Sequence, residues 1–325
     1  MPTKIKFATA KTIKQPVGGL ILEAPQEQDH VLGASGPEFE VLVKDGQWHD
    51  YLPNFELQRN RFGDTFMCVS YSLNNVHETL AKRLFDEVFN KSDLFLGVGS
   101  GTVRGRGNSL RQVADWNRLN GFVLESDYPY LTDTTLDEAY KALSRDLLVK
   151  ALKQLDIFSF GYKWLPDNSN ISLVNGLKMS PIQVAVSGSY KMDRNNYVIW
   201  DRYNPAYNHA VIILGYEDGK CWHVFDSETE QMVKFAWDYP FASPMIHALK
   251  KNMKIQLYKK MGQAGIAIKH VSEPSMIVFS GGSVEGGALF LSLYGVQSFK
   301  EIPLTEVKEW PFPVRHMINT NPIRT

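Results

Sequence analysis

The sequence predicts an α+β protein in which a helical lobe packs against a lobe of antiparallel β-sheet or barrel. Helical periodicity dominates the first half of the chain, whereas short apolar runs separated by turn signals follow from Ile157 onward. Separate runs of helices and of strands are typical of α+β folds. The length of 325 residues suggests about two domains or one enlarged domain. We therefore expect an arm at residues 1–45, a main domain at 46–252 and a small β-rich accessory module at 253–325.

The composition is that of an ordinary globular chain, and it excludes several classes of protein. Hydrophobic residues make up 44% and aromatic residues 12% of the sequence, which argues against disorder. The formal net charge is zero and no long basic stripe occurs, so nucleic acid is not an expected partner. We see no apolar run that would form a signal peptide or a membrane span. The two cysteines suit a reducing compartment, and both the cytoplasm and a virion stay open as locations.

Cys68 stands where a long helix is expected to begin. Apolar residues recur after it at three- and four-residue steps: Val69, Leu73, Val76, Leu80, Leu84 and Val88. Asp64 or Thr65 can act as the N-cap, and the helix is expected to run to about Asn90. The positive end of a helix dipole favours thiolate over thiol, which makes Cys68 a candidate nucleophile. The alternative interpretation is a small buried hydrophobic residue.

A glycine-dense stretch follows at residues 97–108. It has no Gly-Lys-Ser/Thr ending, and its glycines do not match a dinucleotide-binding fingerprint, so a phosphate site is not expected. A loop lining a groove, where the backbone must approach a ligand, is the favoured interpretation. Ser109 and Gly121 are expected to begin and end a second helix, and a third helix is expected at residues 135–155.

A β-hairpin is expected in the second half of the chain. Residues 210–216 form an apolar strand, residues 217–220 a turn, and residues 221–225 the returning strand. His209 opens this hairpin and Asp226 closes it 17 residues later, so the two side chains should be neighbours. A histidine held in one tautomer by an aspartate can serve as the base for a nucleophilic cysteine. The alternative is a purely structural His–Asp pair.

Four segments, in this order, resemble segments of the papain-like cysteine peptidases. They lie between about Trp48 and Leu249, and they are Met67-Cys68-Val69-Ser70-Tyr71-Ser72, then Asn120-Gly121 with Ser126-Asp127-Tyr128-Pro129-Tyr130, then Ser180-Pro181-Ile182-Gln183-Val184-Ala185-Val186, and Asn208-His209-Ala210-Val211-Ile212-Ile213-Leu214-Gly215-Tyr216. The resemblance leaves both ends of the chain unexplained. It looks like that of a divergent member, bacterial or phage-encoded.

The resemblance implies a catalytic triad. Cys68 is the implied nucleophile, and His209 is its base and later its general acid. Asp226 stands where the family usually has asparagine, and it is implied to orient His209. The family's shielding tryptophan, two residues further on, is replaced by Glu228. We therefore expect the His209–Asp226 pair to be wetter than in the family.

The resemblance also implies an oxyanion donor and a substrate-binding segment. Gln58 is the implied side-chain donor to the oxyanion, together with the backbone N–H of Cys68. It precedes Cys68 by ten residues, whereas the family's glutamine stands six before, so a longer loop must fold back. An exposed polar glutamine is the alternative. Gly107 and Asn108 fall near the family's glycines that bind substrate backbone.

Metal and cofactor chemistry is not expected. The spacings His-Glu-x-x-His and Cys-x-x-Cys and the EF-hand loop do not occur, and Gly-x-Ser-x-Gly is absent. Cys221 precedes a tryptophan on a strand and is interpreted as a core residue. His77 lies on the cysteine helix and is interpreted as a packed or surface residue.

The leading hypothesis is a papain-like cysteine peptidase that hydrolyses peptide or isopeptide bonds through an acyl-enzyme on Cys68, without a cofactor. Hydrolysis of peptidoglycan cross-peptides and transamidation would use the same triad and stay open. The rival from another class is a non-catalytic structural or binding protein, such as a virion or cell-surface component, on a papain scaffold. The expected partner is a peptide or protein substrate, and the N-terminal arm or the C-terminal module could engage a further protein.

Overall fold

The computed structural model describes residues 5–9, 18–23, 39–229 and 231–252, together with three strands further on at 255–259, 265–270 and 276–280. The chain divides into two compact units, Met1–Lys250 and Lys251–Thr325. In the described part of the chain, no helix combines the length and the apolar character that crossing a membrane requires.

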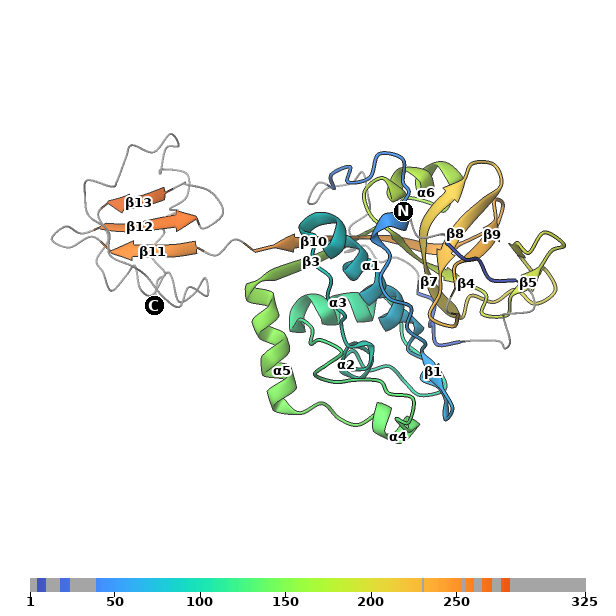
Figure 1. Cartoon of the computed structure of the whole chain (residues 1–325), viewed down its shortest axis with the longest axis horizontal. Helices are drawn as coiled ribbons and strands as arrows, with labels where there is room; N and C mark the ends of the chain where they lie inside the picture. Colours follow the sequence, from blue (N-terminus) through green and yellow to red (C-terminus); the bar gives the residue numbers. More distant parts are fainter. Residues whose placement is uncertain are drawn as a thin grey trace. The chain divides into compact units, whose positions relative to one another are not determined.

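Helix α1 (Cys68–Phe85) is the central helix of the first unit, where it contacts α2 (Asp93–Gly99), α3 (Leu110–Asn120) and strand β7 (His209–Glu217) (Figure 1). Its first 14 residues, Cys68 to Ala81, are all buried. The prediction that Asp64 or Thr65 is the N-cap of α1 is wrong. Met67 occupies the N-cap position, and its side chain makes no capping hydrogen bond. The helix also ends earlier than expected, since Asp86 adopts the left-handed conformation directly after it.

The other helices are short. The structure confirms that Ser109 caps α3 and that Gly121 ends it. The prediction of a single helix at residues 135–155 is wrong. Ser144 is the N-cap of a second helix, so the segment divides into separate helices. The segment contains α4 (Leu136–Ala139), α5 (Arg145–Leu152) and the 3-10 helix η2 (Lys153–Asp156); elsewhere lie α6 (Asn170–Leu177) and the 3-10 helix η1 (His49–Tyr51).

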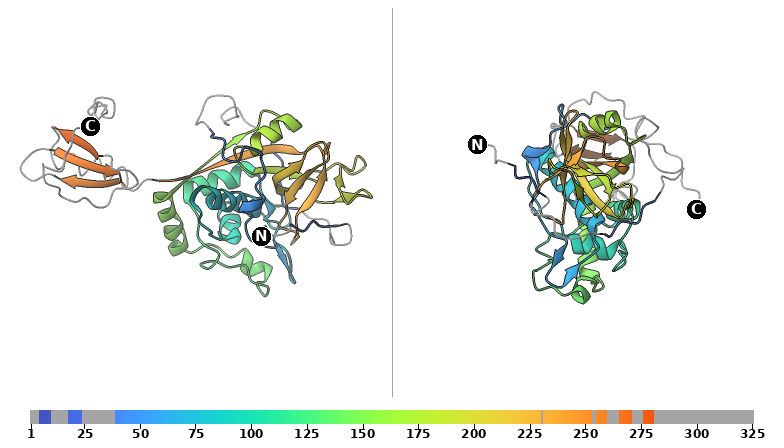
Figure 2. Two further views of the ribbon diagram at one scale, coloured as in Figure 1. Left: turned by 45° about the horizontal axis from the view of Figure 1, so that its top comes forward. Right: turned by 90° about the vertical axis from the view of Figure 1, so that its right-hand side faces the viewer.

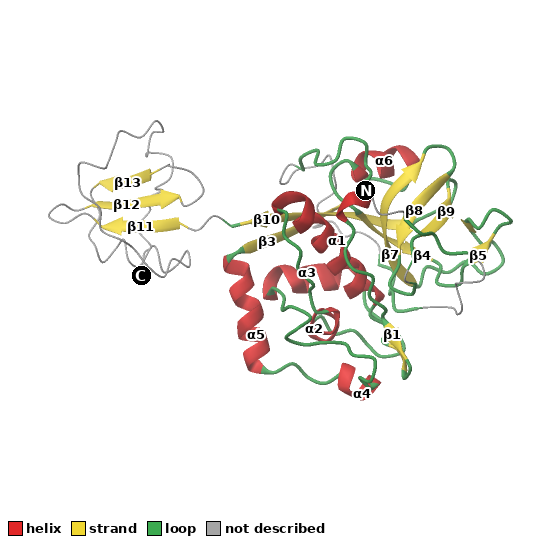
Figure 3. Cartoon of the chain, in the orientation of Figure 1, coloured by secondary structure: helices red, strands yellow, loops and turns green. Residues whose placement is uncertain are grey.

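An eight-stranded sheet forms the other side of the unit, in the order β3-β10-β4-β7-β8-β9-β6-β5. Figure 2 and Figure 3 show α2, α3 and α5 gathered away from the strands β7, β8 and β9. The strands are β3 (Phe158–Trp164), β4 (Ile182–Val186), β5 (Lys191–Met192), β6 (Val198–Ile199), β7 (His209–Glu217), β8 (Cys221–Phe225), β9 (Val233–Ala236) and β10 (Ala242–Lys251). The neighbours β10–β4, β4–β7, β7–β8 and β8–β9 run antiparallel, whereas β6–β9 is parallel. The fold is therefore mixed α and β, as the sequence predicts.

The core joins the two sides of the unit. Every residue of β4 is buried, and so are the first seven residues of β7, because helices or other strands cover both faces of these strands. Val76 and Leu80 of α1 belong to the same apolar cluster as Ile212 and Ile213 of β7. Truncating one such fully buried leucine or isoleucine to alanine typically costs about 2–5 kcal/mol. Packing of α1 on β7 therefore fixes the ends of both elements relative to each other.

The described strands of the second unit form a separate three-stranded antiparallel sheet. They are β11 (Ile255–Lys259), β12 (Gly265–His270) and β13 (Met276–Ser280). The strand expected at residues 276–279 is confirmed. The strands expected at residues 288–294 and 304–310 lie outside the described residues.

Candidate active site

Cys68 is the first residue of α1 and is fully buried. The first N–H groups of a helix have no intrahelical partner and carry its positive end, so they point positive charge toward the region of the thiol. Phe66, two residues earlier, has φ 55°, a conformation that L residues rarely adopt. Strained backbone of this kind persists only where neighbouring contacts hold it in place. The chain therefore enters the helix by a turn that its surroundings impose.

His209 and Asp226 lie side by side at the open end of the β7–β8 hairpin. The antiparallel register pairs Ile212 with Phe225, which brings the start of β7 to the end of β8. His209 Nε2 lies 2.8 Å from Asp226 Oδ1, and both side chains are fully buried. The structure thus brings together the two residues that the hairpin predicts as neighbours.

The electrostatics of this pair favour an imidazolium–carboxylate ion pair. Burial by itself lowers the pKa of His209, but the charge and hydrogen bond of Asp226, helped by Cys68, outweigh it and hold the pKa well above its usual range. Burial raises the pKa of Asp226, but His209 outweighs it and the pKa is lowered. His209 Nδ1 is buried and makes no hydrogen bond to any described residue. Because Nε2 is taken by Asp226, Nδ1 is the nitrogen that remains for the Cys68 thiol, which is among the groups that raise the pKa of His209.

Tyr190 is a third member of this group that sequence reasoning missed. Its hydroxyl donates to Asp226 Oδ2 at 2.7 Å, and its ring lies 6.4 Å from the His209 ring in an edge arrangement. The backbone N–H of Glu228 donates to Asp226 Oδ1 at 3.1 Å. The expectation of a wetter His209–Asp226 pair is wrong, because neither side chain is exposed although Glu228 stands two residues after Asp226.

Glu228 lies close to the His209–Asp226 pair and is itself nearly buried. Its Oε2 lies 2.7 Å from Arg59 Nε, and its side chain is 10% exposed. Burial is the largest cause that raises the pKa of Glu228 to about 7, and the neighbouring Asp64 carboxylate adds to it. Glu228 is therefore a titratable group beside the His209–Asp226 pair.

A hairpin accommodates the long approach from Gln58 to Cys68. Strands β1 (Arg59–Asn60) and β2 (Gly63–Asp64) pair antiparallel, and Thr65 N and Oγ1 both donate to Gln58 O. Gln58 is thereby brought back beside the start of α1, as the sequence requires of a longer loop. The alternative of an exposed glutamine is wrong, because Gln58 is fully buried.

The side-chain amide of Gln58 is held at both ends. Its Nε2 donates to Asp64 Oδ1 at 2.9 Å, and its Oε1 accepts from Ser227 Oγ at 2.7 Å. Asp64 Oδ1 also accepts from Phe66 N at 2.7 Å. The side chain expected to cap the helix therefore shapes the loop in front of it instead. Since an amide nitrogen carries two hydrogens, Gln58 keeps one donor beyond its bond to Asp64.

Gly107 and Asn108 hold a segment of the N-terminal arm. Asn108 N donates to Gly19 O at 2.9 Å and Asn108 O accepts from Ile21 N at 2.8 Å, which forms a parallel bridge between Leu20 and Asn108. A Cβ on Gly107 would lie 1.8 Å from Gly19 O. The glycine is thus required for the arm to approach this closely.

The same arm segment reaches the other side of the site. Leu20 N donates to Asn208 O, the residue before His209, at 2.9 Å. A Cβ on Gly19, whose φ is +125°, would lie 2.5 Å from Phe66 O. Leu20 is 6% exposed and belongs to the same apolar cluster as Cys68. Residues 18–23 therefore run between the loop that ends at Asn108 and the start of β7, beside the first turn of α1.

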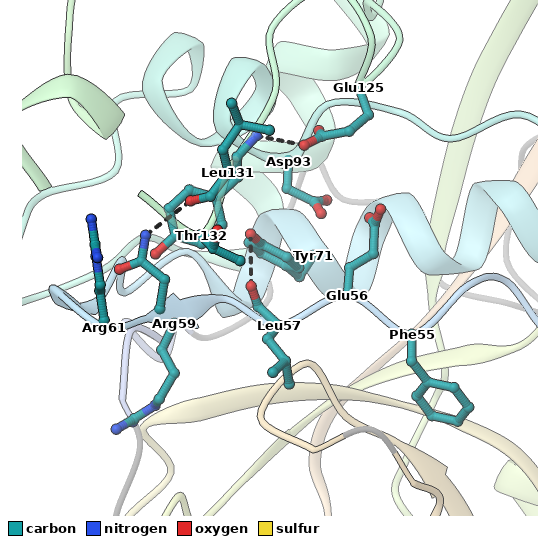
Figure 4. Close-up of a pocket in the computed structure, with 12 residues that line it drawn as sticks. Phe55, Glu56, Leu57, Arg59, Arg61, Tyr71, Asp93, Glu125, Leu131 and Thr132 are labelled. Carbon is teal, nitrogen blue, oxygen red and sulfur yellow. Dashed lines mark hydrogen bonds between the residues drawn. The ribbon is translucent and has the colours of Figure 1, made fainter. Parts of the chain in front are cut away.

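A pocket of about 510 Å³ is lined in part by residues 55–57 and 59–61 and by Tyr71 of α1. Figure 4 shows the carboxylates of Glu56, Asp93 and Glu125 gathered on one side of it. Burial, the largest cause, and mutual repulsion raise the pKa of Asp93, and burial raises that of Glu125 to about 7. The raised pKa values reduce the negative charge that these carboxyl groups carry near neutral pH. Nothing in the sequence pattern indicates the pocket.

The comparisons identify the fold. The structure matches the cysteine protease and lectin-like domains of Cwp84, a surface layer associated protein of Clostridium difficile, with TM-score 0.53 and 13% identity over 78% of this chain. The chain covers 61% of that structure's length. It also matches xylellain, a cysteine protease from Xylella fastidiosa, with TM-score 0.51 and 17% identity over 75% of this chain and 98% of that one. No family model and no curated protein matches the sequence.

These likenesses establish that the chain has a papain-like α+β fold, as the resemblance in the sequence implied. Both matches are cysteine proteases. The likeness is one of fold. The sequence identities of 13% and 17% do not assign roles to individual residues.

Proposed function

We propose that the protein is a papain-like cysteine peptidase, a thiol hydrolase that acts on peptide or isopeptide bonds. The observation that carries the proposal is the buried His209–Asp226 pair, 2.8 Å apart, whose free ring nitrogen is left for a cysteine at the start of a helix. A nucleophile, a base within reach and a group that orients the base are the three parts that covalent catalysis needs. Cys68, His209 and Asp226 supply one part each.

The proposed reaction proceeds through an acyl-enzyme. The Cys68 thiolate attacks the carbonyl carbon, and the imidazolium of His209 donates its Nδ1 proton to the leaving amine as the C–N bond breaks. His209, now neutral, removes a proton from water, and the resulting hydroxide attacks the thioester. The acid is released, Cys68 regains its thiolate and His209 its proton. Asp226 keeps the ring oriented and stabilises its charged form.

The oxyanion of the tetrahedral intermediates would lie at the first turn of α1. The backbone N–H of Cys68 is one donor there, because it has no partner within the helix. The remaining N–H of Gln58 is the second, held in direction by Asp64 and Ser227. One such donor contributes about 3–4 kcal/mol to the transition state in comparable acyl-transfer reactions.

The arm segment 18–23 inhibits this activity by occupying the place of a substrate. It forms strand-like hydrogen bonds with Asn108, where the resemblance puts substrate backbone, and it covers the neighbourhood of Cys68 through Leu20. Burying a leucine side chain stabilises such a contact by about 1.5–3 kcal/mol. A substrate strand and this segment compete for the same backbone groups. The enzyme is therefore inactive while the arm is seated and active once it is displaced.

A substrate screen with matched variants tests the proposal. Wild type and Cys68→Ala are assayed against dye-labelled casein, an isopeptide-linked dipeptide and peptidoglycan cross-peptides. Hydrolysis of any of these by the wild type and its loss in Cys68→Ala supports a thiol hydrolase and names the bond. Equal activity in both proteins contradicts the proposal. Hydrolysis of none of them, with the arm displaced, favours the structural or binding protein on the same scaffold.

A further inference from the structure

A second group of chemically reactive side chains lies at the closed end of the β7–β8 hairpin, away from His209 and Asp226. Glu217, Cys221 and His223 each offer a metal-ligand atom, and these atoms lie within 4.8 Å of one another. Among the residues that the structure describes, this is the one group of three His, Cys, Asp or Glu side chains with such spacing. The proposed peptidase mechanism uses none of them.

The strand register explains why these three residues meet. Glu217 pairs with Cys221 across the hairpin, and directly paired residues present their side chains on the same face of a sheet. Cys221 and His223 are two residues apart on β8 and so share that face. Sequence reasoning missed the group because its spacing, Glu-x-x-x-Cys-x-His, matches no standard metal motif; only the hairpin brings the glutamate in.

The ring of His223 is oriented by a further contact. Its Nδ1 lies 2.9 Å from His49 Nε2, whereas its Nε2 faces Glu217 Oε1 at 3.3 Å. Gly215 makes room for this arrangement, because a Cβ there would lie 2.6 Å from the His49 ring. A histidine that ligates a metal characteristically has its other nitrogen hydrogen-bonded in this way. Nε2 is therefore the His223 nitrogen that faces Glu217 and is left to bind a metal ion.

Two lysines neutralise Glu217 in this structure: Lys220 Nζ lies 3.8 Å from its Oε2, and Lys234 makes the closer contact. Lys234 pairs with His223 across β8 and β9, and its Nζ lies 2.6 Å from Glu217 Oε1. The Lys234 ammonium and a metal ion would compete for the same carboxylate. This competition gives a test that a merely structural polar cluster would not pass.

We propose that Glu217, Cys221 and His223 form a binding site for a zinc ion, with His49 orienting His223 and Lys234 competing with the metal. Thiolate and imidazole together with one carboxylate form a donor set that zinc accepts in tetrahedral geometry. With metal–ligand distances of about 2.0–2.3 Å, tetrahedral donors lie about 3.3–3.8 Å apart, so modest rotation of the side chains closes the site. Three protein ligands leave a fourth position for water. The metal would link β7 to β8 at the end of the hairpin opposite the triad.

Cobalt replaces zinc as a spectroscopic probe in the test. The full chain carrying Cys68→Ala has Cys221 as its only cysteine. Titration of this protein with Co²⁺ is expected to produce a thiolate-to-cobalt charge-transfer band that saturates at one metal per chain and disappears when Zn²⁺ is added. Adding Cys221→Ser should abolish the band.

Three further variants in the same background keep the test decisive if Cys221→Ser fails to fold. Glu217→Gln should weaken Co²⁺ binding by about tenfold or more, and Lys234→Met should strengthen it by a similar factor. Asp218→Asn, at an exposed carboxylate in the adjacent turn, is the matched control and should leave the affinity unchanged. No charge-transfer band in the folded Cys68→Ala protein overturns the proposal. So does an affinity that neither Glu217→Gln nor Lys234→Met changes.

Discussion

Asp226 lies 2.8 Å from His209 with both side chains fully buried, and the Tyr190 hydroxyl donates to its other oxygen at 2.7 Å. The Asp226 carboxylate carries a full negative charge, which an asparagine in its place would not. This charge is the main reason that the pKa of His209 stays well above its usual range despite burial.

Asp226→Asn should therefore lower the pKa of His209. The imidazolium would then be lost at lower pH, and the alkaline limb of the rate profile should move down by about 1–3 pH units. Hydrolysis of the substrate found in the screen, measured as kcat/KM from pH 5 to 10, checks this. An unchanged alkaline limb would mean that Asp226 does not set the protonation of the base.

Gln58→Ala should lower kcat by about 10²–10³-fold with little change in KM, because the lost interaction is made in the transition state. Ser227→Ala is the matched control, since it removes the hydrogen bond to Gln58 Oε1 and keeps the donor. Steady-state kinetics of the two variants, with thermal unfolding to confirm the fold, are the measurement. Equal losses of kcat in Gln58→Ala and Ser227→Ala would contradict the oxyanion role and leave Gln58 with a structural role only.

Gly19→Ala should displace the arm. The added Cβ would lie 2.5 Å from the carbonyl oxygen of Phe66, and the φ of +125° is one that alanine rarely adopts. Gly18→Ala is a close control, because the Cβ there meets nothing nearer than 3.9 Å. Alkylation of Cys68 by iodoacetamide, followed by peptide mass spectrometry, should be at least about tenfold faster in Gly19→Ala than in wild type or Gly18→Ala. Similar rates in all three would show that residues 18–23 do not cover the thiol.

Glu228→Gln should change how stability depends on pH. The pKa of Glu228 is about 7 in the folded protein, above the usual 4.5, so the folded state keeps a proton that the unfolded chain releases between these values. The free energy of unfolding of wild type consequently falls as pH rises from about 4.5 to about 7. The glutamine variant lacks this decrease because its side chain does not titrate. In urea unfolding, the free energy of unfolding of the variant relative to wild type should increase by on the order of 2 kcal/mol between pH 5 and pH 8. A constant difference would contradict the raised pKa.

The β7–β8 hairpin could be predicted because its signals are local. A run of apolar residues, a turn and a returning strand specify a register, and that register brings His209 to Asp226. Tyr190 reaches Asp226 from 36 residues earlier in the chain, in a segment without a strong periodic pattern. No local signal marks such a contact, and for the same reason the low exposure of the pair could not be foreseen.

The start of α1 differs from the prediction for a related reason. Asp64 has the right type and position for an N-cap, but its carboxylate accepts from Gln58 and Phe66 within the preceding hairpin. A short polar side chain bonds whichever N–H groups the tertiary structure presents to it. The contact between Gly19 and Asn108 is likewise invisible in the sequence, because two glycine-containing segments 89 residues apart must meet to reveal it.

The central claim is that Cys68 is a nucleophile activated by His209. Its most direct test is the rate of covalent labelling by a peptidyl epoxide at pH 6, mapped by mass spectrometry in wild type, in Gly19→Ala and in Gly19→Ala with His209→Ala. We predict a single adduct on Cys68, formed fastest in Gly19→Ala and slowed by about 10²-fold or more when His209 is removed. An adduct confined to Cys221, or labelling of Cys68 that does not depend on His209, would contradict the account.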